Sequence, residues 1–282
     1  MLILNGQQLE PGAPEITLLN RSFKYGDSLF ETIRVYNGKL PFLLYHMERL
    51  LAGMKVLQYD FDPEKFRLLL SQEMDRLLAL NQVDKHGYIR LQVYRAGAGA
   101  YTPIQNKPYY LMEAQSFKDD PFQGTAPQQL VAYQALSLHF DSLSPFKTGN
   151  ALPYVLAGIY AKEQGADDAV LFNQKEVADT AGANIFVVRQ QKIFTPPISS
   201  GCLDGVMRRQ LFLLCKELKV PLEAKKLKLK DLHQADEIFL TNSVRGIIPV
   251  SRFEDTAWTG DAPLTQFLRQ CLQQFVREKF RS

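Results

Sequence analysis

The sequence is poor in the residues from which metal sites and disulfide frameworks are built. Its three cysteines, Cys202, Cys215 and Cys271, lie far apart and form no Cys-x-x-Cys pair, so neither a zinc site nor a set of disulfides is indicated. The four histidines are also spaced unlike metal ligands. We therefore expect no metal cofactor, and we expect the cysteines to be reduced and structural.

Charge of a single sign and long apolar runs are missing too. The 33 basic and 30 acidic residues leave a net charge of +3, without the concentrated basic face that nucleic-acid binding usually needs. No stretch approaches the roughly twenty apolar residues that cross a bilayer. Residues 1–6 have neither a basic leader nor a small-residue cleavage site, which favours a first strand there. We expect a cytoplasmic protein that binds neither nucleic acid nor membranes.

The apolar residues that are present, 46% of the chain, are enough for a packed core. Their spacing changes repeatedly between strand-like and helix-like, which predicts an α/β (α+β) fold. Branched and aromatic residues predict strands at 28–36, 87–94, 130–139, 237–240 and 247–250, with several short strands in 168–190. Amphipathic or strongly apolar segments predict helices at 45–57, 63–80, 149–164, 206–218 and 262–280.

Turn-forming residues gather in one segment, 119–127, which we interpret as a linker. It would separate a small N-terminal α/β domain, 1–118, from a larger C-terminal domain, 128–282. Ligand sites often lie where two domains meet. The sequence therefore predicts two α/β domains with a site between them.

Three features of the sequence suit an anionic cofactor. A glycine-led helix start at Gly205-Val206-Met207 offers backbone amides and the positive end of a helix dipole to a phosphate. Lys147, on a short turn ahead of a helix, is a candidate for a Schiff base with a carbonyl. Asp179 supplies a carboxylate. Singly, each has an ordinary structural explanation, but together they are what pyridoxal phosphate needs: a lysine, a phosphate seat and an acid that keeps the pyridine nitrogen protonated.

These residues lie in a longer, ordered set of motifs that covers nearly the whole chain. The set comprises residues 25–35, 46–50, Asp179, 184–186, Thr195, 203–208 and 235–243, followed by Pro249-Val250. In this order the motifs resemble those of the class IV aminotransferase family, the pyridoxal-phosphate enzymes of fold type IV. The resemblance implies pyridoxal 5'-phosphate as cofactor, a larger C-terminal domain with a mixed, barrel-like sheet, and a homodimer.

The resemblance also implies a role for each matching residue. Lys147 forms the aldimine and moves protons on and off the substrate carbon, while Asp179 faces the pyridine nitrogen. The implied cofactor contacts are Arg49, Ser243 and the backbone of Gly205, Val206 and Met207 for the phosphate, with Leu203 against the ring. The implied substrate contacts are Tyr25, Phe30, Tyr88, Arg90 and the turn at Asn242, with Arg90 meeting a second acidic group. Taken singly, Arg49 is typical of a surface ion-pair residue and the aromatic residues of a core.

One position departs from the family pattern, because the family has Glu where this chain has Asp179. An aspartate is one methylene shorter. Its carboxylate would reach the ring nitrogen through a small shift of ring or strand, or through a water molecule.

Two reactions of the family compete for this chain. One is the transfer of an amino group to 2-oxoglutarate from a branched-chain or D-amino acid, and the other is the elimination of pyruvate from 4-amino-4-deoxychorismate to give 4-aminobenzoate. Residues 147–150 and Met207 favour the lyase or the D-amino-acid enzymes, whereas residues 88–90 and 30–34 resemble branched-chain aminotransferases. We lean to the lyase. A third hypothesis is a protein that binds the cofactor without turnover, because Asp179 has weakened catalysis.

Overall fold

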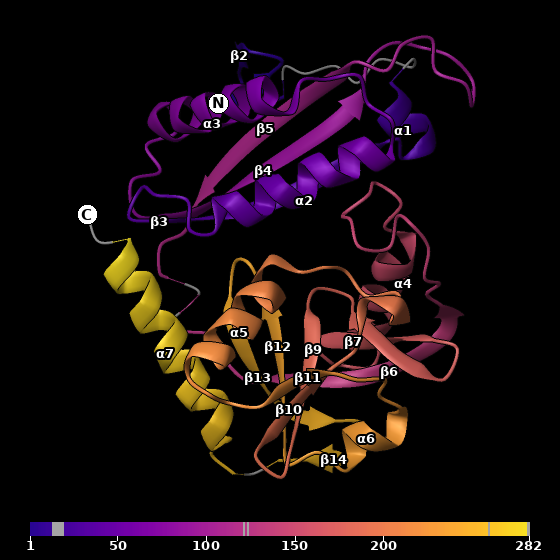
Figure 1. Ribbon diagram of the computed structural model, residues 1–282, viewed down its shortest axis with the longest axis vertical. Helices are drawn as coiled ribbons and strands as arrows, with labels where there is room; N and C mark the ends of the chain where they lie inside the picture. The colour runs from indigo at the N-terminus through magenta and orange to yellow at the C-terminus, as the bar shows by residue number, and fades with distance from the viewer. Residues whose placement is uncertain (13–19, 121, 123, 259, 281–282) are drawn as a thin grey trace. The chain divides into compact units, whose positions relative to one another are not determined.

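The computed structural model describes residues 1–12, 20–120, 122, 124–258 and 260–280, and it consists of two compact units (Figure 1). The first unit is built mainly from Met1–Asp120 together with Phe146–Asn150, and the second from Pro121–Pro145 and Ala151–Lys279. The predicted linker, 119–127, includes the change from one unit to the other, and its residues 121 and 123 lie outside the described residues. We keep 1–118 and 128–282 as proposed domain limits, except that Phe146–Asn150, within the second range, belongs to the first unit.

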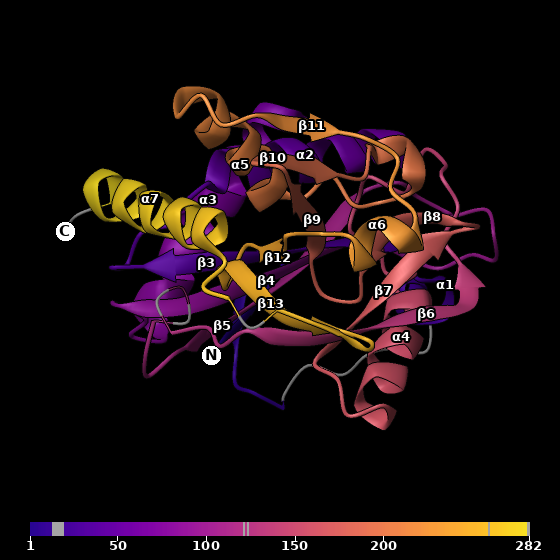
Figure 2. The ribbon, with the colours of Figure 1, turned by 90° about the horizontal axis from the view of Figure 1, so that it is seen from below.

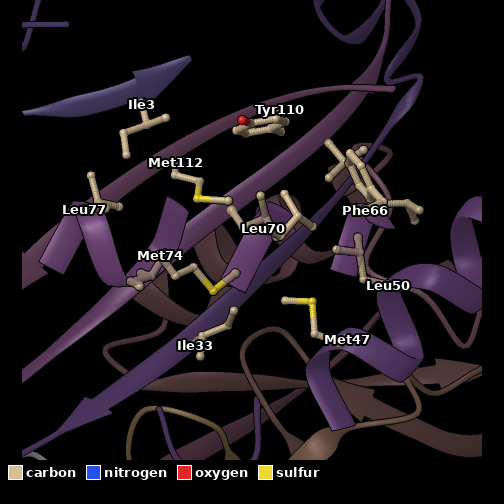
Figure 3. Packing of buried hydrophobic residues seen from close by; sticks show 14 of the residues in the cluster. Ile3, Ile33, Met47, Leu50, Phe66, Leu70, Met74, Leu77, Tyr110 and Met112 are labelled. Atoms are coloured by element: carbon tan, nitrogen blue, oxygen red, sulfur yellow. The ribbon is translucent and has the colours of Figure 1, made fainter. Parts of the chain in front are cut away.

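The first unit is an antiparallel sheet covered by two helices. Among the described residues its strands run in the order β2-β1-β5-β4-β3. Their bounds are β1 Leu2–Leu4, β2 Gln7–Leu9, β3 Ser28–Tyr36, β4 His86–Arg95 and β5 Pro108–Ser116, with a short helix α1 at Arg21–Tyr25. Helices α2 (Leu43–Val56) and α3 (Pro63–Leu80) pack on the sheet through Met47, Leu50, Leu70, Met74 and Leu77, which meet Ile3, Ile33 and Met112 from the strands (Figure 3).

The segment that carries Lys147 is fixed to the free edge of β3. The amide of Phe30 donates to the carbonyl of Lys147 at 2.8 Å, and the amide of Gly149 donates to the carbonyl of Ser28 at 2.9 Å. A Cβ at Gly149 would lie 2.5 Å from Ser28 Oγ, so a side chain here would push the segment off the strand. The helix predicted from residue 149 therefore begins later, with α4 at Leu152–Glu163, because residues 147–149 are held in strand-like pairing.

The second unit is built on a mixed sheet that curls round on itself (Figure 2). The strands of its described residues run in the order β11-β10-β9-β12-β13-β6-β7-β8, with β14 beside β13. Strands β8 and β9 are joined by only three residues, 181–183, yet the path between them through the sheet crosses four other strands. The sheet must curve to bring them together, and this confirms the predicted barrel-like fold.

The elements of the second unit lie close to where apolar spacing predicts them. The strands are β6 Gln128–Ser137, β7 Asp168–Asn173, β8 Glu176–Thr180, β9 Asn184–Arg189, β10 Lys192–Thr195, β11 Leu222–Ala224, β12 Glu237–Asn242, β13 Gly246–Phe253 and β14 Thr256–Ala257. The remaining helices are a single 3-10 turn at Ile198–Ser200, α5 Val206–Glu217, α6 Leu229–His233 and α7 Pro263–Lys279. Within the described ranges, none of the helices is both long and apolar enough to cross a membrane.

Candidate active site

Asp179 is a buried acid of the second unit. It lies on β8 with only 3% of its surface exposed. Its Oδ2 accepts a hydrogen bond from the backbone amide of Leu203 at 3.0 Å, and its Oδ1 accepts one from Asn184 Nδ2 at 3.2 Å. Burial, and then the negative charge of Asp179, raise the pKa of the Tyr154 hydroxyl and that of the Cys202 thiol, the latter to about 12. Both neighbours therefore stay protonated beside the carboxylate at neutral pH.

Asn184 ties this acid to the start of α5. Its Nδ2 also donates to the carbonyl of Leu203 at 2.9 Å, which fixes the loop of residues 203–205 against β9. A Cβ at Gly205 would lie 1.9 Å from Asn184 Oδ1, so only glycine fits there. The acid and the helix start are thus parts of one packed arrangement.

The start of α5 has the character of an anion site. Gly205 stands at its N-cap position, and no side chain caps the first amides of the helix. Those amides have no acceptor within the helix itself, and Val206 and Met207 are buried. On β12, paired with Asn184, Thr241 Oγ1 is buried and has no hydrogen-bond partner among the described residues. A phosphate would supply acceptors for such donors, so the residues present fit the predicted group.

The turn after β12 is shaped by Asn242. Its Oδ1 accepts hydrogen bonds from the amides of Val244 at 3.2 Å and Arg245 at 2.8 Å. Its Nδ2 donates to the carbonyl of Gly182 at 3.4 Å, which joins this turn to the turn between β8 and β9. The amides of Val244 and Arg245, in the turn predicted to contact the substrate, therefore already donate to Asn242. Ser243 lies on the same turn.

In the first unit, Lys147 and Arg90 both lie against the ring of Phe30. Lys147 Nζ is 4.7 Å from the ring centroid, and Arg90 Cζ is 4.2 Å from it. Phe30 and Arg90 come from the paired strands β3 and β4, at diagonal positions on one face. Two basic side chains beside one aromatic ring make this small area favourable to anionic ligands.

Arg49 is held in a buried ion pair rather than at the surface. Its Nε and Nη2 donate to Glu31 Oε1 and Oε2 at 2.8 and 2.5 Å, and His46 Nδ1 lies 2.7 Å from Oε2. Burial would raise the pKa of Glu31, but the charge of Arg49 and the bond to His46 outweigh it and lower the pKa to about 2. Burial lowers the pKa of His46, and the charges of Arg49 and Lys147 add to this. His46 is therefore neutral beside an ionised Glu31.

The other two predicted substrate residues also lie in the first unit. The ring of Tyr25 is 5.6 Å from that of Tyr101, with Arg21 Cζ 5.1 Å above it. Tyr88 donates its hydroxyl hydrogen to Gln115 Oε1 at 2.7 Å. The predicted residues thus form two groups, one in each unit. The first group is Tyr25, Phe30, Arg49, Tyr88, Arg90 and Lys147, and the second is Asp179, Leu203, Gly205, Val206, Met207, Asn242 and Ser243.

Sequence reasoning did not assign roles to three further residues that contact members of these two groups. Glu31 lies inside a recognised motif, but its pairing with Arg49 depends on α2 packing against β3. Tyr154 approaches Asp179 from α4, and nothing in its local sequence indicates this. Asn184 belongs to a motif of the sequence but has no role assigned there. Its amide contacts both Asp179 and Gly205, two other residues of the motifs, and an asparagine between them in the chain is a signal that could have indicated this.

The sequence model described as "Amino-transferase class IV" matches residues 28–253, most of the chain. The chain belongs to the class IV aminotransferase family. Within the family it is 31% identical to the putative branched-chain-amino-acid aminotransferase of Methanocaldococcus jannaschii, over 88% of this chain and 86% of that protein. It is 30% identical to the aminodeoxychorismate lyase of Bacillus subtilis, over 99% and 97%. It is 28% identical to the D-alanine aminotransferase of Bacillus licheniformis, over 98% and 96%.

Solved structures of the class IV family show the same fold. The branched-chain aminotransferase from Thermoproteus uzoniensis superposes with a TM-score of 0.88 at 24% identity, covering 99% of this chain and 95% of that one. The branched-chain amino acid aminotransferase from Thermobaculum terrenum in its PLP form gives 0.86 at 22%, covering 99% and 94%. The predicted fold type and the prediction of an enzyme of this family are confirmed. The relatives carry names of both competing reactions, so family membership leaves the reaction open.

The Glu31–Arg49 pair gives a test by pH. Glu31→Gln leaves the charge of Arg49 buried without its carboxylate, and we expect a loss of about 3–5 kcal/mol of unfolding free energy at neutral pH. Because the pKa of Glu31 is lowered on folding to about 2, its contribution is complete above the unfolded pKa and is lost as the pH falls toward the folded one. The difference between wild type and variant should therefore shrink at acid pH.

Urea unfolding of both proteins without cofactor, at neutral pH and at about pH 3, measures this difference. The control is Glu64→Gln, which removes an exposed ion pair with Arg67 and should change stability little at either pH. A difference for Glu31→Gln that is the same at both pH values would contradict the assignment of an ionised Glu31.

Proposed function

We propose that this protein is a pyridoxal-phosphate enzyme that removes pyruvate from 4-amino-4-deoxychorismate to give 4-aminobenzoate. One observation carries the cofactor assignment: Asp179, a buried carboxylate, is bonded to the loop that leads into an uncapped helix start. An acid and an anion seat joined in this way match the two ends of a pyridoxal ring. Names given to relatives support the same cofactor, since a solved relative is described in its PLP form.

Each residue has a defined task in this proposal. The amides of Val206 and Met207, led by Gly205, bind the phosphate together with the Ser243 hydroxyl and the fork of Arg49. Glu31 keeps that fork in one orientation by holding two of its nitrogens. Leu203 packs on the ring.

The chemistry is divided between a lysine and an acid. When bound, pyridoxal phosphate supplies a ring that draws electrons from the reacting carbon of an amino substrate. Asp179 holds a proton at the ring nitrogen, which keeps the ring electron-poor. Lys147 carries a proton to and from the substrate carbon, and its amine lies against the ring of Phe30.

The proposed substrate contacts are groups on the first unit's sheet and the turn at Asn242 in the second unit. Phe30 and Arg90 offer an aromatic face and a guanidinium within one small area of that sheet, which suits a ring that carries a carboxylate. Tyr88 lies on β4 of the same sheet and Tyr25 ends α1, and Asn242 fixes the turn that follows β12. This juxtaposition of Phe30 and Arg90 is what favours the lyase substrate.

Two alternatives use the same residues. An aminotransferase acting on branched-chain or D-amino acids with 2-oxoglutarate uses the same lysine, acid and phosphate seat, and it would use Arg90 for the second carboxylate of 2-oxoglutarate. A protein that binds the cofactor without turnover would follow if Asp179, being short, failed to reach the ring nitrogen. The substrates consumed by the purified protein distinguish all three.

The purified enzyme, loaded with pyridoxal phosphate, is incubated with aminodeoxychorismate in the absence of any keto acid. We expect 4-aminobenzoate and pyruvate in equal amounts. Formation of glutamate from 2-oxoglutarate with branched-chain amino acids or D-alanine, and no 4-aminobenzoate, would establish the aminotransferase instead. If neither assay gives product, the protein that binds the cofactor without turnover is the remaining hypothesis.

Lys147→Ala tests the cofactor assignment separately from the substrate. We expect the wild-type protein to be yellow and the variant to lose the visible band, because the cofactor can no longer be bonded to the chain. Lys226→Ala, which removes an exposed lysine paired with Glu176, is the control and should keep both colour and activity. A colourless wild-type protein after reconstitution would refute the proposed function as a whole.

We also propose that the enzyme is a homodimer. Leu152, Val155, Leu156 and Ile159 lie at helical spacing on α4, and each is between 42% and 72% exposed. In a two-fold dimer the same stripe of a second copy can cover it. Light scattering should give the dimer mass, and Leu156→Glu should shift it toward the monomer, whereas Leu213→Glu on α5 should not. A monomeric wild type would contradict this.

A further inference from the structure

The turn between β8 and β9 is held by a carboxylate that the proposed reaction does not use. Asp168, the first residue of β7, is 5% exposed. Its Oδ1 accepts hydrogen bonds from the amides of Ala169 at 2.7 Å and Ala181 at 3.0 Å. Its Oδ2 accepts from Thr180 Oγ1 at 2.8 Å and from the amide of Gly182 at 3.2 Å. Three of these four bonds reach across to a single turn.

Thr180 closes the same turn from within. Its amide donates to the carbonyl of Ala183 at 2.9 Å, and its Oγ1 accepts from the amide of Ala183 at 3.0 Å. The Thr180 hydroxyl could donate its hydrogen either to Asp168 Oδ2 or to the carbonyl of Ala183. Because the backbone amide of Thr180 already donates to that carbonyl, the hydroxyl hydrogen is better used by Asp168. The carboxylate, the hydroxyl and the backbone thus fix residues 180–183 in one conformation.

The two residues beside this turn are Asp179 and Asn184, which hydrogen-bond to each other. A glutamate could adjust to a displaced strand with its extra torsion, but an aspartate cannot, so the backbone sets where the Asp179 carboxylate lies. The backbone there is set by the turn. Burial raises the pKa of Asp168, against the bonds from Thr180 and the three amides, and these bonds are what keep a carboxylate in this place.

We propose that Asp168 is a positioning residue for the proposed reaction: by fixing residues 180–183 it sets the place of the Asp179 carboxylate relative to the cofactor's ring nitrogen. This rests on the proposed function, because it assumes that Asp179 serves that nitrogen. It extends the function to a residue outside the site and explains how a short acid is kept in reach.

The chain offers a matched control one residue away. Asp167 and Asp168 are both acidic, and both interact electrostatically with Arg245. The carboxylate of Asp167, however, accepts a hydrogen bond from the amide of Gln129 and not from the turn at 180–183. Asp168→Asn replaces one acceptor oxygen by an NH2 group, which cannot accept, so either the two amide bonds at Oδ1 or the Gly182 amide bond at Oδ2 is lost. Asp167→Asn makes the same chemical change without touching residues 180–183.

The experiment is a double-mutant cycle of Asp168→Asn and Asp179→Asn in the reconstituted enzyme. We expect Asp168→Asn to lower kcat about tenfold to a hundredfold, as misplacement of a reacting group does, with KM and cofactor affinity nearly unchanged. The absorption band of the bound cofactor should move in the same direction as in Asp179→Asn. In the Asp179→Asn background the second substitution should have no further effect on kcat. Asp167→Asn should match wild type throughout.

Three results would overturn the proposal, and they are distinguishable. Wild-type kcat and spectrum in Asp168→Asn would show that the turn does not set the acid. A full additional loss in the Asp179→Asn background would show that Asp168 acts by another route, with the proposed function intact. Full activity of Asp179→Asn itself would remove the assumed role of Asp179 from the proposed function and this proposal with it.

If Asp168→Asn does not fold, the partner hydroxyl provides a milder test. Thr180→Val removes the donor to Asp168 and the acceptor for Ala183, whereas Thr180→Ser keeps both. We expect the spectral shift and the loss of kcat in Thr180→Val and their rescue in Thr180→Ser. Equal behaviour of the two variants would overturn the proposal.

Discussion

The carboxylate of Asp179, held between the backbone amide of Leu203 and the side-chain amide of Asn184, is the interaction on which the rest of the second unit's site depends. Asn184 also binds the carbonyl of Leu203, and its side chain fills the space that any side chain at Gly205 would need. The acid, the loop and the start of α5 are therefore one rigid piece. A buried carboxylate is costly unless its oxygens are bonded, so the same bonds maintain its charge and its place.

The first unit solves the opposite problem, that of burying cations. Arg49 is 9% exposed, and its charge is balanced by Glu31, which is more deeply buried. Glu31 accepts hydrogen bonds from two guanidinium nitrogens of Arg49 and also contacts the ring of His46. Removing one partner of a buried ion pair is costly, but replacing the whole pair by apolar residues often is not. The Glu31–Arg49 pair therefore indicates that Arg49 must be held in one orientation, more than that the fold needs the stability. Lys147 is placed by backbone pairing with β3. The groups proposed to react are thus fixed by side-chain bonds at Asp179 and Arg49 and by backbone pairing at Lys147.

Local sequence predicted the elements well where one short stretch contains the whole cause. Asp62 caps α3 and Pro63 opens it, so its bounds, Pro63–Leu80, match the expected 63–80. Prediction failed where the cause lies far along the chain. The start of α4 is moved to Leu152 by pairing of residues 147–149 with β3. Glu31 and Tyr154 acquire their neighbours only through packing. The residues of the motifs were recognisable, whereas the bonds that hold them were not.

The short acid is the point at which we expect this chain to depart from its family's pattern, and the central claim is that Asp179 nevertheless keeps the cofactor's ring nitrogen protonated. Nitrogen-15 NMR of the enzyme reconstituted with pyridoxal phosphate labelled at that nitrogen measures the protonation directly. At neutral pH we expect the resonance of a protonated pyridinium nitrogen, and a shift toward that of a neutral pyridine in Asp179→Asn. A neutral pyridine resonance in the wild-type enzyme would contradict the account.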